Sequence, residues 1–296
     1  MKIAVTGASG FIGTELLAVL QKQDNIETIA LARSSSGHED TDRCRWRGTD
    51  YSVESLTEAL DGADVVVHLA GVRGTENDPE KFAVNCQMTE NILKAMTAAG
   101  AGRIVFASTM SVYNDDSLMP WTEEAPLRGR SCYGDSKADC EQFIAAYAAE
   151  NGITYGIARI AQVLGLGEKR RGMMNVFIDT AREKGVLTVM GRSVVKKQFI
   201  YVKDLANILL LLACGGESFC ACENIIVNAG MADAYTNLEI AQIVNRVYEN
   251  DTPINYDDSY PERGRPFLMN TDRLRKELGY APLDMEEALR KIKEEQ

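Results

Sequence analysis

The sequence is poor in histidine and in positive charge. Only two of its 296 residues are histidine, and 43 aspartates and glutamates outnumber 32 lysines and arginines, which leaves a formal net charge of −11. Proteins that bind nucleic acid or anionic membrane surfaces usually carry clustered positive charge. We therefore expect neither nucleic acid nor a membrane as a partner.

The sequence also lacks a long apolar run and a disulfide pattern. The longest run, LANILLLLACGG from Leu205, is too short to span a bilayer, and the first residues enter a strand pattern without the apolar segment of a cleavable signal. Seven cysteines are an odd number without regular spacing. Cys214, Cys220 and Cys222 lie close together, but they lack zinc-finger spacing and histidine partners, so we expect no metal site. These features predict a cytoplasmic protein.

Short apolar stretches rich in β-branched residues alternate with helical patterns through the first half of the chain. The predicted strands are 2–6, 27–32, 63–70, 102–108 and 153–159, and the predicted helices are 11–22, 52–60, 80–99 and 134–150. Nearly continuous apolar runs are typical of strands that are buried on both faces of a parallel sheet. The alternation predicts an α/β fold with a Rossmann-type, doubly wound parallel sheet.

The rhythm changes after Gly165. A basic loop and a helix come first, then a strand at QFIYV, a helix over 203–213 and one more sheet strand at 223–230. A helix, a short strand near Ile254 and two closing helices complete the chain. We therefore expect two domains. Residues 1–165 and 198–229 would form the dinucleotide-binding domain, and 166–197 and 230–296 a substrate-binding domain over the carboxyl edge of the sheet.

Three glycines follow the first predicted strand within seven positions. Gly7, Gly10 and Gly13 form a Gly-x-x-Gly-x-x-Gly pattern before a helix that starts near Gly10. In such a turn the first glycine allows a sharp bend, the second lets the backbone approach a pyrophosphate, and the third lets the helix pack on the strand. The N–H groups of the helix N-terminus favour the same anion. The pattern predicts a dinucleotide site rather than a merely flexible turn.

The end of the second predicted strand indicates which dinucleotide is bound. An acidic residue for the ribose of NAD is expected about 20 residues past the glycines, but the strand ends in LARSSS, residues 31–36. Arg33 with Ser34 and Ser35 can take a 2′-phosphate, which favours NADP and leaves NAD possible. The alternative for Arg33 is a solvated surface charge.

Tyr133 and Lys137 form a Tyr-x-x-x-Lys pair on a predicted helix. This spacing places them on one helix face, one turn apart. A tyrosine hydroxyl has a pKa of about 10, and a neighbouring ammonium with a cationic nicotinamide ring would lower that pKa and make the phenol a usable base. Ser108 and Thr109 end a predicted sheet strand, where a hydroxyl can orient a substrate oxygen. This context favours catalysis over the alternative of two surface residues.

These features occur together in one known family. The sequence resembles the extended short-chain dehydrogenase/reductases, and among them the NAD(P)-dependent epimerase/dehydratase family. The shared motifs occur in family order over essentially the whole chain: TGASGFIG (6–13), Asp50, DVVVHLAG (64–71), VNCQMTENIL (84–93), FASTMSVY (106–113), YGDSK (133–137), QFIYVKDLA (198–206) and NAG (228–230). The resemblance implies a Rossmann fold and dinucleotide-dependent chemistry.

The resemblance also implies roles for individual residues. Tyr133 would be the general acid/base, Lys137 would bind the nicotinamide ribose and tune Tyr133, and Thr109 would bond to the reacting oxygen. The resemblance places Asp50 and Tyr51 beside the adenine, Leu69, Ala70 and Gly71 along the pyrophosphate, and Asn85 as a support of the backbone. The other candidate cofactor residues are Gly7, Ser9, Gly10, Phe11, Ile12 and Gly13 in the turn, Arg33 and Ser34 at the ribose, and Ser108.

A sugar nucleotide is the implied substrate. The implied substrate residues are Ser108, Thr109, Asn175, Lys197 and Arg263, of which Asn175 and the two cations would contact the diphosphate. Arg265 is the alternative to Arg263, and for these cations a solvated surface charge is an equal alternative. Met110 and Ser111 replace the Asp-Glu pair of the sugar-nucleotide 4,6-dehydratases, which disfavours water elimination.

The leading interpretation is a nucleotide-sugar epimerase that acts by hydride transfer through a transient keto intermediate. An NADP-dependent reductase of a keto sugar or small ketone is the alternative. A non-catalytic NADP-sensing module is a third, which the retained Tyr133, Lys137 and Thr109 disfavour. Family members commonly pair through the Tyr-x-x-x-Lys helix, so residues 136–150 suggest a homodimer, although packing on the sheet would also explain their apolar residues.

Overall fold

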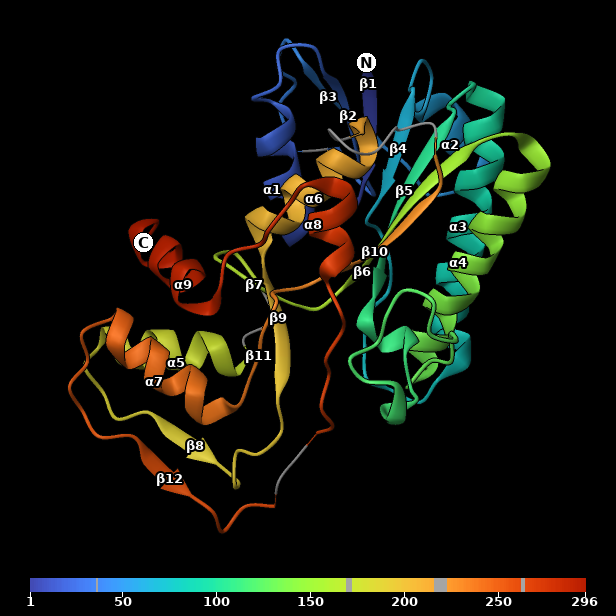
Figure 1. Ribbon diagram of the computed structural model, residues 1–296. Coiled ribbons are helices and arrows are strands. Elements are labelled where there is room, and N and C mark those ends of the chain that lie inside the picture. The colour runs from blue at the N-terminus through green and yellow to red at the C-terminus, as the bar shows by residue number, and fades with distance from the viewer. Residues whose placement is uncertain (36, 169–171, 216–222, 262–263) are drawn as a thin grey trace.

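A seven-stranded parallel sheet forms the larger part of the molecule (Figure 1). The computed structural model describes residues 1–35, 37–168, 172–215, 223–261 and 264–296. The strand order is β10-β6-β5-β4-β1-β2-β3, with every neighbouring pair parallel. The strands are β1 (Lys2–Thr6), β2 (Glu27–Ala32), β3 (Cys44–Gly48), β4 (Val65–His68), β5 (Arg103–Thr109), β6 (Thr154–Ile160) and β10 (Ile225–Ala229). This order confirms the predicted Rossmann-type sheet.

Helices cover both faces of this sheet. One face carries α1 (Phe11–Leu20), α6 (Val202–Cys214) and α8 (Asp272–Leu278), and the other carries α2 (Val53–Ala59), α3 (Pro79–Ala99) and α4 (Cys132–Asn151) (Figure 1). The two buried apolar clusters lie between these helices and the sheet. Each strand and helix predicted for the first half of the chain is present, with bounds that shift by three residues or fewer.

The edge strand β3 is the one strand of this sheet that the sequence pattern does not predict. Its residues CRWRG alternate arginine with other side chains, and only Cys44 is fully buried. A strand at the edge of a sheet needs no apolar residue at every position, so it lacks the continuous apolar run that marks its neighbours.

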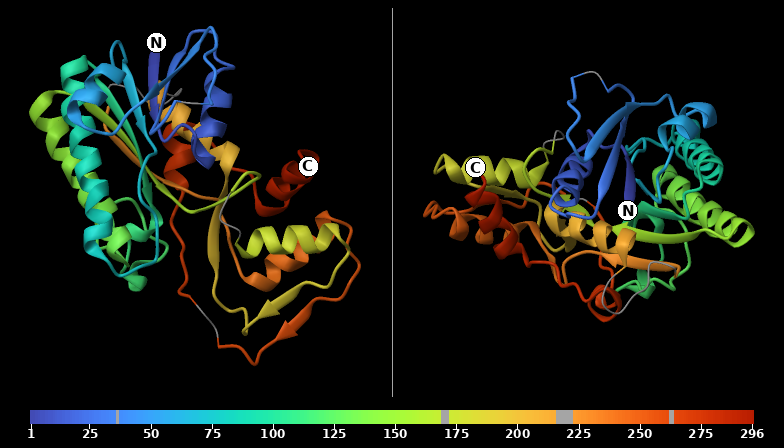
Figure 2. Two further views of the ribbon diagram at one scale, coloured as in Figure 1. Left: turned by 180° about the vertical axis from the view of Figure 1, so that it is seen from behind. Right: turned by 90° about the horizontal axis from the view of Figure 1, so that it is seen from above.

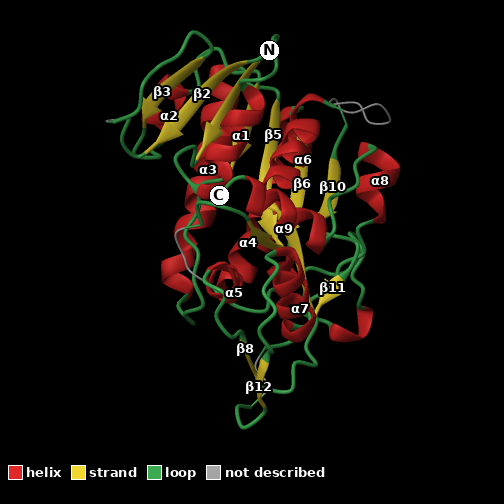
Figure 3. Cartoon of the chain, turned by 90° about the vertical axis from the view of Figure 1, so that its left-hand side faces the viewer, coloured by secondary structure: helices red, strands yellow, loops and turns green. Residues whose placement is uncertain are grey.

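A second lobe has its own apolar core and lies beyond the end of the sheet where the parallel strands finish (Figures 1 and 2). Its helices are α5 (Met173–Arg182), α7 (Asn237–Val247) and α9 (Met285–Glu294). Its strands form two small sheets, β11 (Ala234–Tyr235) with β9 (Lys197–Tyr201) and β7 (Gln162–Leu164), and β12 (Asn255–Asp257) with β8 (Thr188–Met190). The β8–β12 ribbon is at the far end of the molecule from the N-terminus (Figure 3).

A long connection between β5 and α4 packs beside the segment that leads into α8. It contains two 3₁₀ turns, η1 (Met110–Val112) and η2 (Asp116–Leu118). Trp121 in this connection donates its backbone N–H to the carbonyl of Leu268 at 3.0 Å and accepts from the N–H of Asn270 at 2.8 Å. Across the described ranges, no helix is both long enough and apolar enough to cross a membrane.

Candidate active site

The glycine turn lies tightly between β1, β4 and α1. Gly7 has a φ of +68°, and a Cβ added there would lie 2.9 Å from the backbone nitrogen of Ala70. A Cβ on Gly13 would lie 2.4 Å from the carbonyl oxygen of Gly7. Both positions therefore require glycine, the first for its left-handed backbone and both for close approach. The predicted pyrophosphate residues, 69–71, follow β4 directly and adjoin this turn.

The N-terminus of α1 is available to an anion. Gly10 is its N-cap, has no side chain to bond the first N–H groups, and is exposed together with Ser9. Uncapped N–H groups and the helix dipole attract a phosphate. Phe11 and Ile12, which begin the helix, also pack against the core of the second lobe. These two residues thus fix the turn relative to that lobe.

The predicted adenosine residues gather at the ends of β2 and β3. Arg33 and Ser34 are exposed. A hydrogen bond from the backbone of Ser52, 2.9 Å from the carboxylate, lowers the pKa of Asp50. Burial raises the pKa of Tyr51, whereas a hydrogen bond from the Gly7 backbone and the charge of Arg33 act to lower it. Tyr51, which has a φ of +66°, therefore connects this region to the glycine turn.

Helix α4 carries the Tyr-x-x-x-Lys pair. The Ser131 hydroxyl accepts a hydrogen bond from the N–H of Gly134 at 3.2 Å, so the helix begins at Cys132 and Tyr133 lies in its first turn. Lys137 is only 4% exposed. Its ammonium donates to the Ala107 carbonyl at 2.9 Å. Burial lowers the pKa of Lys137 to about 8.

Tyr133 lies beside Thr109 and is partly buried, with its ring centroid 5.9 Å from that of Phe82. Burial raises the pKa of Tyr133, and the charge of Arg73 and a hydrogen bond from Thr109 act to lower it. From the sequence alone, Lys137 is expected to cause this lowering. In the structure, the ammonium of Lys137 is bonded to β5, and the main opposing charge is that of Arg73.

Arg73 is a site residue that the sequence pattern does not single out. It lies three residues after Ala70 in the loop that follows β4, and its guanidinium is 3.5 Å from the carboxylate of Glu168. Its one sequence signal is a cation close behind the predicted pyrophosphate residues, and its effect on Tyr133 depends on tertiary structure.

Asn85 holds the loop after β4 against α4. Its side-chain oxygen accepts from the N–H of Val72 at 2.7 Å, and its amide donates to the Val72 carbonyl at 3.1 Å and to the Ser136 hydroxyl at 3.2 Å. A Cβ on Gly71 would lie 3.3 Å from Asn85 Oδ1 and 3.6 Å from Lys137 Nζ. Asn85 thus holds the backbone that faces Lys137.

Ser108 lies in a different setting from its neighbour Thr109. Its side chain is buried, and its hydroxyl donates to the carboxylate of Glu141 on α4. The predicted contacts of Ser108 with cofactor and substrate would therefore require its hydroxyl to leave this partner.

The predicted substrate residues are distributed over the second lobe. Asn175 is in the first turn of α5, where its side chain accepts from the N–H of Gly172 at 3.2 Å. Lys197 begins β9 and donates to Asn237 at 3.1 Å. Arg263, like Cys220 and Cys222, lies outside the described residues. Arg265 is bonded to Asp116 at 2.7 Å, which ties it to the β5–α4 connection.

The sequence of this chain matches a known family over most of its length. The model of the NAD dependent epimerase/dehydratase family matches residues 3–219. The chain belongs to this family. This confirms the predicted resemblance and identifies the protein as an enzyme of the extended short-chain dehydrogenase/reductase type that depends on NAD(P).

Individual members of the family resemble the whole chain. UDP-glucuronic acid decarboxylase 6 of Arabidopsis thaliana is 28% identical over 95% of this chain and 84% of its own length. The crystal structure of UDP-N-acetylglucosamine 4-epimerase from Bacillus cereus is 29% identical, has a TM-score of 0.86 and covers 99% of this chain and 95% of its own. UDP-glucuronic acid 4-epimerase from Bacillus cereus, solved with UDP-glucuronic acid and NAD, shares the fold at 22% identity, with a TM-score of 0.84 and coverages of 99% and 98%.

Proposed function

We propose that this family member is an NAD(P)-dependent nucleotide-sugar epimerase. The observation that carries the proposal is the cluster of Tyr133, Thr109 and Lys137 at the carboxyl end of a parallel sheet, next to the glycine turn. The tight turn and the uncapped start of α1 fit a pyrophosphate. The likeness to a UDP-N-acetylglucosamine 4-epimerase supports the same activity class.

Proton transfer in this proposal is carried out by Tyr133. As phenolate it accepts the proton of a sugar hydroxyl, while the Thr109 hydroxyl holds the same sugar oxygen in place. A nicotinamide bound beside them supplies reversible hydride transfer with the sugar carbon. The keto sugar then presents its other face, where its carbon would take back the hydride as Tyr133 returns the proton to the ketone oxygen. Lys137 binds the ribose and adds positive charge beside the phenolate.

The second lobe supplies the proposed substrate site. We assign residues 166–197 and 230–296 to substrate binding and 1–165 with 198–229 to dinucleotide binding, except that β7 and β9 pair within the second lobe and α8 packs on the large sheet. Asn175, Lys197 and Arg263 would contact the diphosphate of the sugar nucleotide, where charge-assisted bonds to phosphate oxygens are strong. In this proposal Lys197 turns from Asn237 to the phosphate oxygens, and the side-chain NH2 of Asn175 donates to them while its oxygen keeps the Gly172 N–H.

Two sets of observations bear on the dinucleotide. Arg33 and Ser34, exposed at the end of β2, support NADP because they stand where an acidic residue would bind the ribose of NAD, and a cation can pair with a 2′-phosphate. The UDP-glucuronic acid 4-epimerase of Bacillus cereus, by contrast, was solved in complex with NAD. Comparing the dissociation constants of NAD⁺ and NADP⁺ for wild type and Arg33→Ala decides between them. Loss of tight NADP⁺ binding in the variant supports NADP, and unchanged NADP⁺ affinity overturns it.

A homodimer and a cytoplasmic location are part of this proposal. On α3 and α4, Val84 and Phe143 are 48% and 38% exposed. Apolar side chains on adjacent exposed helices favour a partner surface, and a second copy of the chain is the proposed partner. The cysteines without disulfide spacing support a reducing compartment. Sedimentation of Val84→Glu beside wild type tests the dimer, since a buried charge there would release monomers.

The decisive experiment has two parts. The protein is purified without added cofactor and denatured, and any released dinucleotide is identified by mass spectrometry. The wild type, Tyr133→Phe and Tyr147→Phe are then assayed for interconversion of UDP-N-acetylglucosamine and UDP-glucuronic acid with their 4-epimers. Tyr147 is the matched control, because it lies on the same helix and bonds to Thr97 at 3.0 Å.

The expected result is retained cofactor and epimerisation that only Tyr133→Phe abolishes. Full activity of Tyr133→Phe with normal cofactor binding would refute the mechanism. An empty protein that binds NADPH reversibly and reduces ketones would establish the reductase instead.

A further inference from the structure

A buried ion pair lies behind the catalytic end of α4, and the mechanism above makes no use of it. Glu141 on α4 and Arg159 on β6 have side chains that are each 3% exposed, and Arg159 Nη2 is 2.8 Å from Glu141 Oε2. Arg159 Nε adds contacts of 3.1 and 3.2 Å to the two carboxylate oxygens. Although burial acts to lower the pKa of Arg159, the charge and hydrogen bonds of Glu141 raise it above its ordinary value.

The pair belongs to a set of contacts between β5 and α4. Three consecutive residues of β5 each bond to one of three residues spaced by four along α4. The pairs are the Ala107 carbonyl with the Lys137 ammonium at 2.9 Å, the Ser108 hydroxyl with the Glu141 carboxylate, and the Thr109 hydroxyl with the Tyr133 phenol. A spacing of four places the three α4 residues on one helix face. Two of these three contacts hold proposed catalytic groups, and Glu141 supplies the third.

Arg159 neutralises the buried charge of Glu141, which would otherwise act on Lys137. Glu141 is one helical turn from Lys137, and opposite charges at that spacing attract each other. Both groups are buried, where the attraction is stronger than in water. A carboxylate without Arg159 would draw the ammonium away from the Ala107 carbonyl and from the ribose that it is proposed to bind. With Arg159 present, the carboxylate oxygens are bonded to the guanidinium and to the Ser108 hydroxyl.

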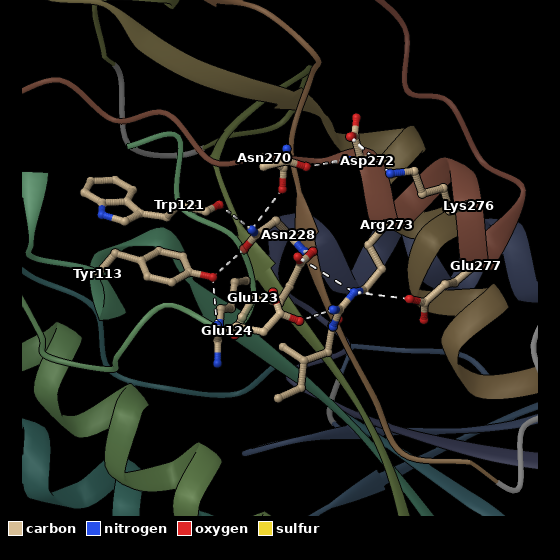
Figure 4. Close-up of polar contacts among 12 residues, drawn as sticks. Tyr113, Trp121, Glu123, Glu124, Asn228, Asn270, Asp272, Arg273, Lys276 and Glu277 are labelled. Carbon is tan, nitrogen blue, oxygen red and sulfur yellow. Dashed lines mark hydrogen bonds and ion pairs between the residues drawn. The ribbon is translucent and has the colours of Figure 1, made fainter. Parts of the chain in front are cut away.

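Arg159 is itself held from behind. Its Nη1 donates to the Tyr113 hydroxyl at 2.7 Å and to the Glu123 carbonyl at 2.8 Å. Figure 4 shows how this support continues, because the Tyr113 hydroxyl donates to Asn228 at 2.7 Å and the Asn228 amide donates to the carbonyl of Asn270 at 2.9 Å. The guanidinium therefore has a fixed position from which to orient the carboxylate.

We propose that Glu141 and Arg159 are positioning residues for the catalytic end of β5 and α4. Arg159 keeps the Glu141 carboxylate on Ser108 and away from Lys137, so that the ammonium, Thr109 and Tyr133 keep their relative places. The inference rests on the proposed function for the roles of Tyr133 and Lys137.

A double-mutant cycle tests the inference with Glu141→Gln, Arg159→Met and the combined variant. The readouts are the dissociation constant of NAD⁺, the kcat and KM for the UDP sugar that wild type epimerises, and stability in urea. Arg159→Met should lower kcat by about 100-fold and weaken NAD⁺ by about 10-fold, because it leaves a buried carboxylate beside Lys137. The combined variant removes that charge and should recover at least about 10-fold in both quantities, which is a large coupling between the two sites.

Two further variants separate positioning from stability. Ser108→Ala removes a hydroxyl without burying a charge, so it keeps the test available if Arg159→Met does not fold. It should lower kcat with little change in KM, whereas a change confined to KM would indicate a direct substrate contact and contradict the inference. Asp204→Asn is the matched control. Asp204 is a buried carboxylate on α6, far from the proposed reaction in sequence, and it accepts a hydrogen bond from the Tyr280 hydroxyl at 2.7 Å. This variant should lose stability and keep kcat.

The inference is overturned if the combined variant is no better than Arg159→Met and Ser108→Ala has wild-type kcat. Failure of the proposed function gives a different result. Wild type would then epimerise no UDP sugar. The NAD⁺ dissociation constants would still test the positioning role, because the combined variant either binds NAD⁺ more tightly than Arg159→Met or does not.

Discussion

Removal of the buried ammonium of Lys137 should stabilise the cofactor-free protein while it destroys the site. Burial lowers the pKa of Lys137 from its ordinary value of 10.5 to about 8. At neutral pH Lys137 is still protonated in the folded state, so burying its charge costs free energy relative to the unfolded chain. A methionine of similar length carries no charge and fits an apolar setting, so Lys137→Met should remove this cost.

The magnitude follows from the change in pKa. A fall from 10.5 to about 8, at about 1.36 kcal/mol per pKa unit, is a cost of about 3 kcal/mol below pH 8. Lys137→Met also loses the 2.9 Å hydrogen bond to the Ala107 carbonyl, which reduces the expected stabilisation by about 1 kcal/mol. We expect a net stabilisation of about 2 kcal/mol at pH 7. Between about pH 8 and 10.5 the unfolded chain binds more protons than the folded one, so wild-type stability rises with pH across that window.

Urea unfolding of wild type and Lys137→Met at intervals from pH 7 to 10 measures both effects. The variant should be more stable at pH 7, and the difference should shrink as wild type gains stability with rising pH. Lys94→Met, which alters an exposed lysine on α3, is the control for the loss of a positive charge. A variant that is less stable than wild type at pH 7, or a difference that does not change with pH, would refute the reasoning.

Three further perturbations test other parts of the site. Arg73→Met should shift the acid limb of the kcat/KM profile upward by less than about one pH unit, because its charge lowers the pKa of Tyr133 from a position that is 58% exposed; an unchanged limb would contradict this. Gly13→Ala should cost about 3 kcal/mol and abolish NAD⁺ binding, since its methyl would lie 2.4 Å from a carbonyl of the turn; Gly102→Ala, with open space, is the control for thermal unfolding. Burial holds the pKa of His68 well below its ordinary 6.5, so the free energy of unfolding should decrease as the pH is lowered below 6.5. His68→Gln should reduce this dependence on pH, and equal slopes for the two proteins would count against the reasoning.

The larger lobe is predictable from the sequence because its signals are local. A strand buried on both faces needs an apolar side chain at nearly every position, as the fully buried β4 and β5 show. Edge strand β3 and the short strands β7, β8 and β11 carry no such run. Strands of two or three residues depend on the partner that they meet, and that partner is distant in sequence.

The site residues also fall into those that local sequence patterns reveal and those that depend on distant contacts. The glycine turn and the Tyr133–Lys137 pair are visible because each lies within one element and has a fixed spacing. Arg73 acts on Tyr133 across 60 positions of sequence, and the contact of Ser108 with Glu141 spans 33. No local pattern encodes such pairs. The sequence therefore indicates which groups react, while the charges that surround them emerge only when β4, β5 and α4 pack together.

The free-energy cost of burying the Lys137 ammonium should be partly offset when the cofactor binds. Ribose hydroxyls would accept hydrogen bonds from an ammonium that now has the Ala107 carbonyl and the face of Phe106, 4.3 Å away, as partners. A ligand that binds only the folded state stabilises it in proportion to its affinity. A buried charge that NAD⁺ satisfies should therefore make the gain in stability on adding NAD⁺ larger for wild type than for Lys137→Met. Thermal unfolding with and without NAD⁺ measures the two gains, and equal gains would mean that the ammonium contributes nothing to binding.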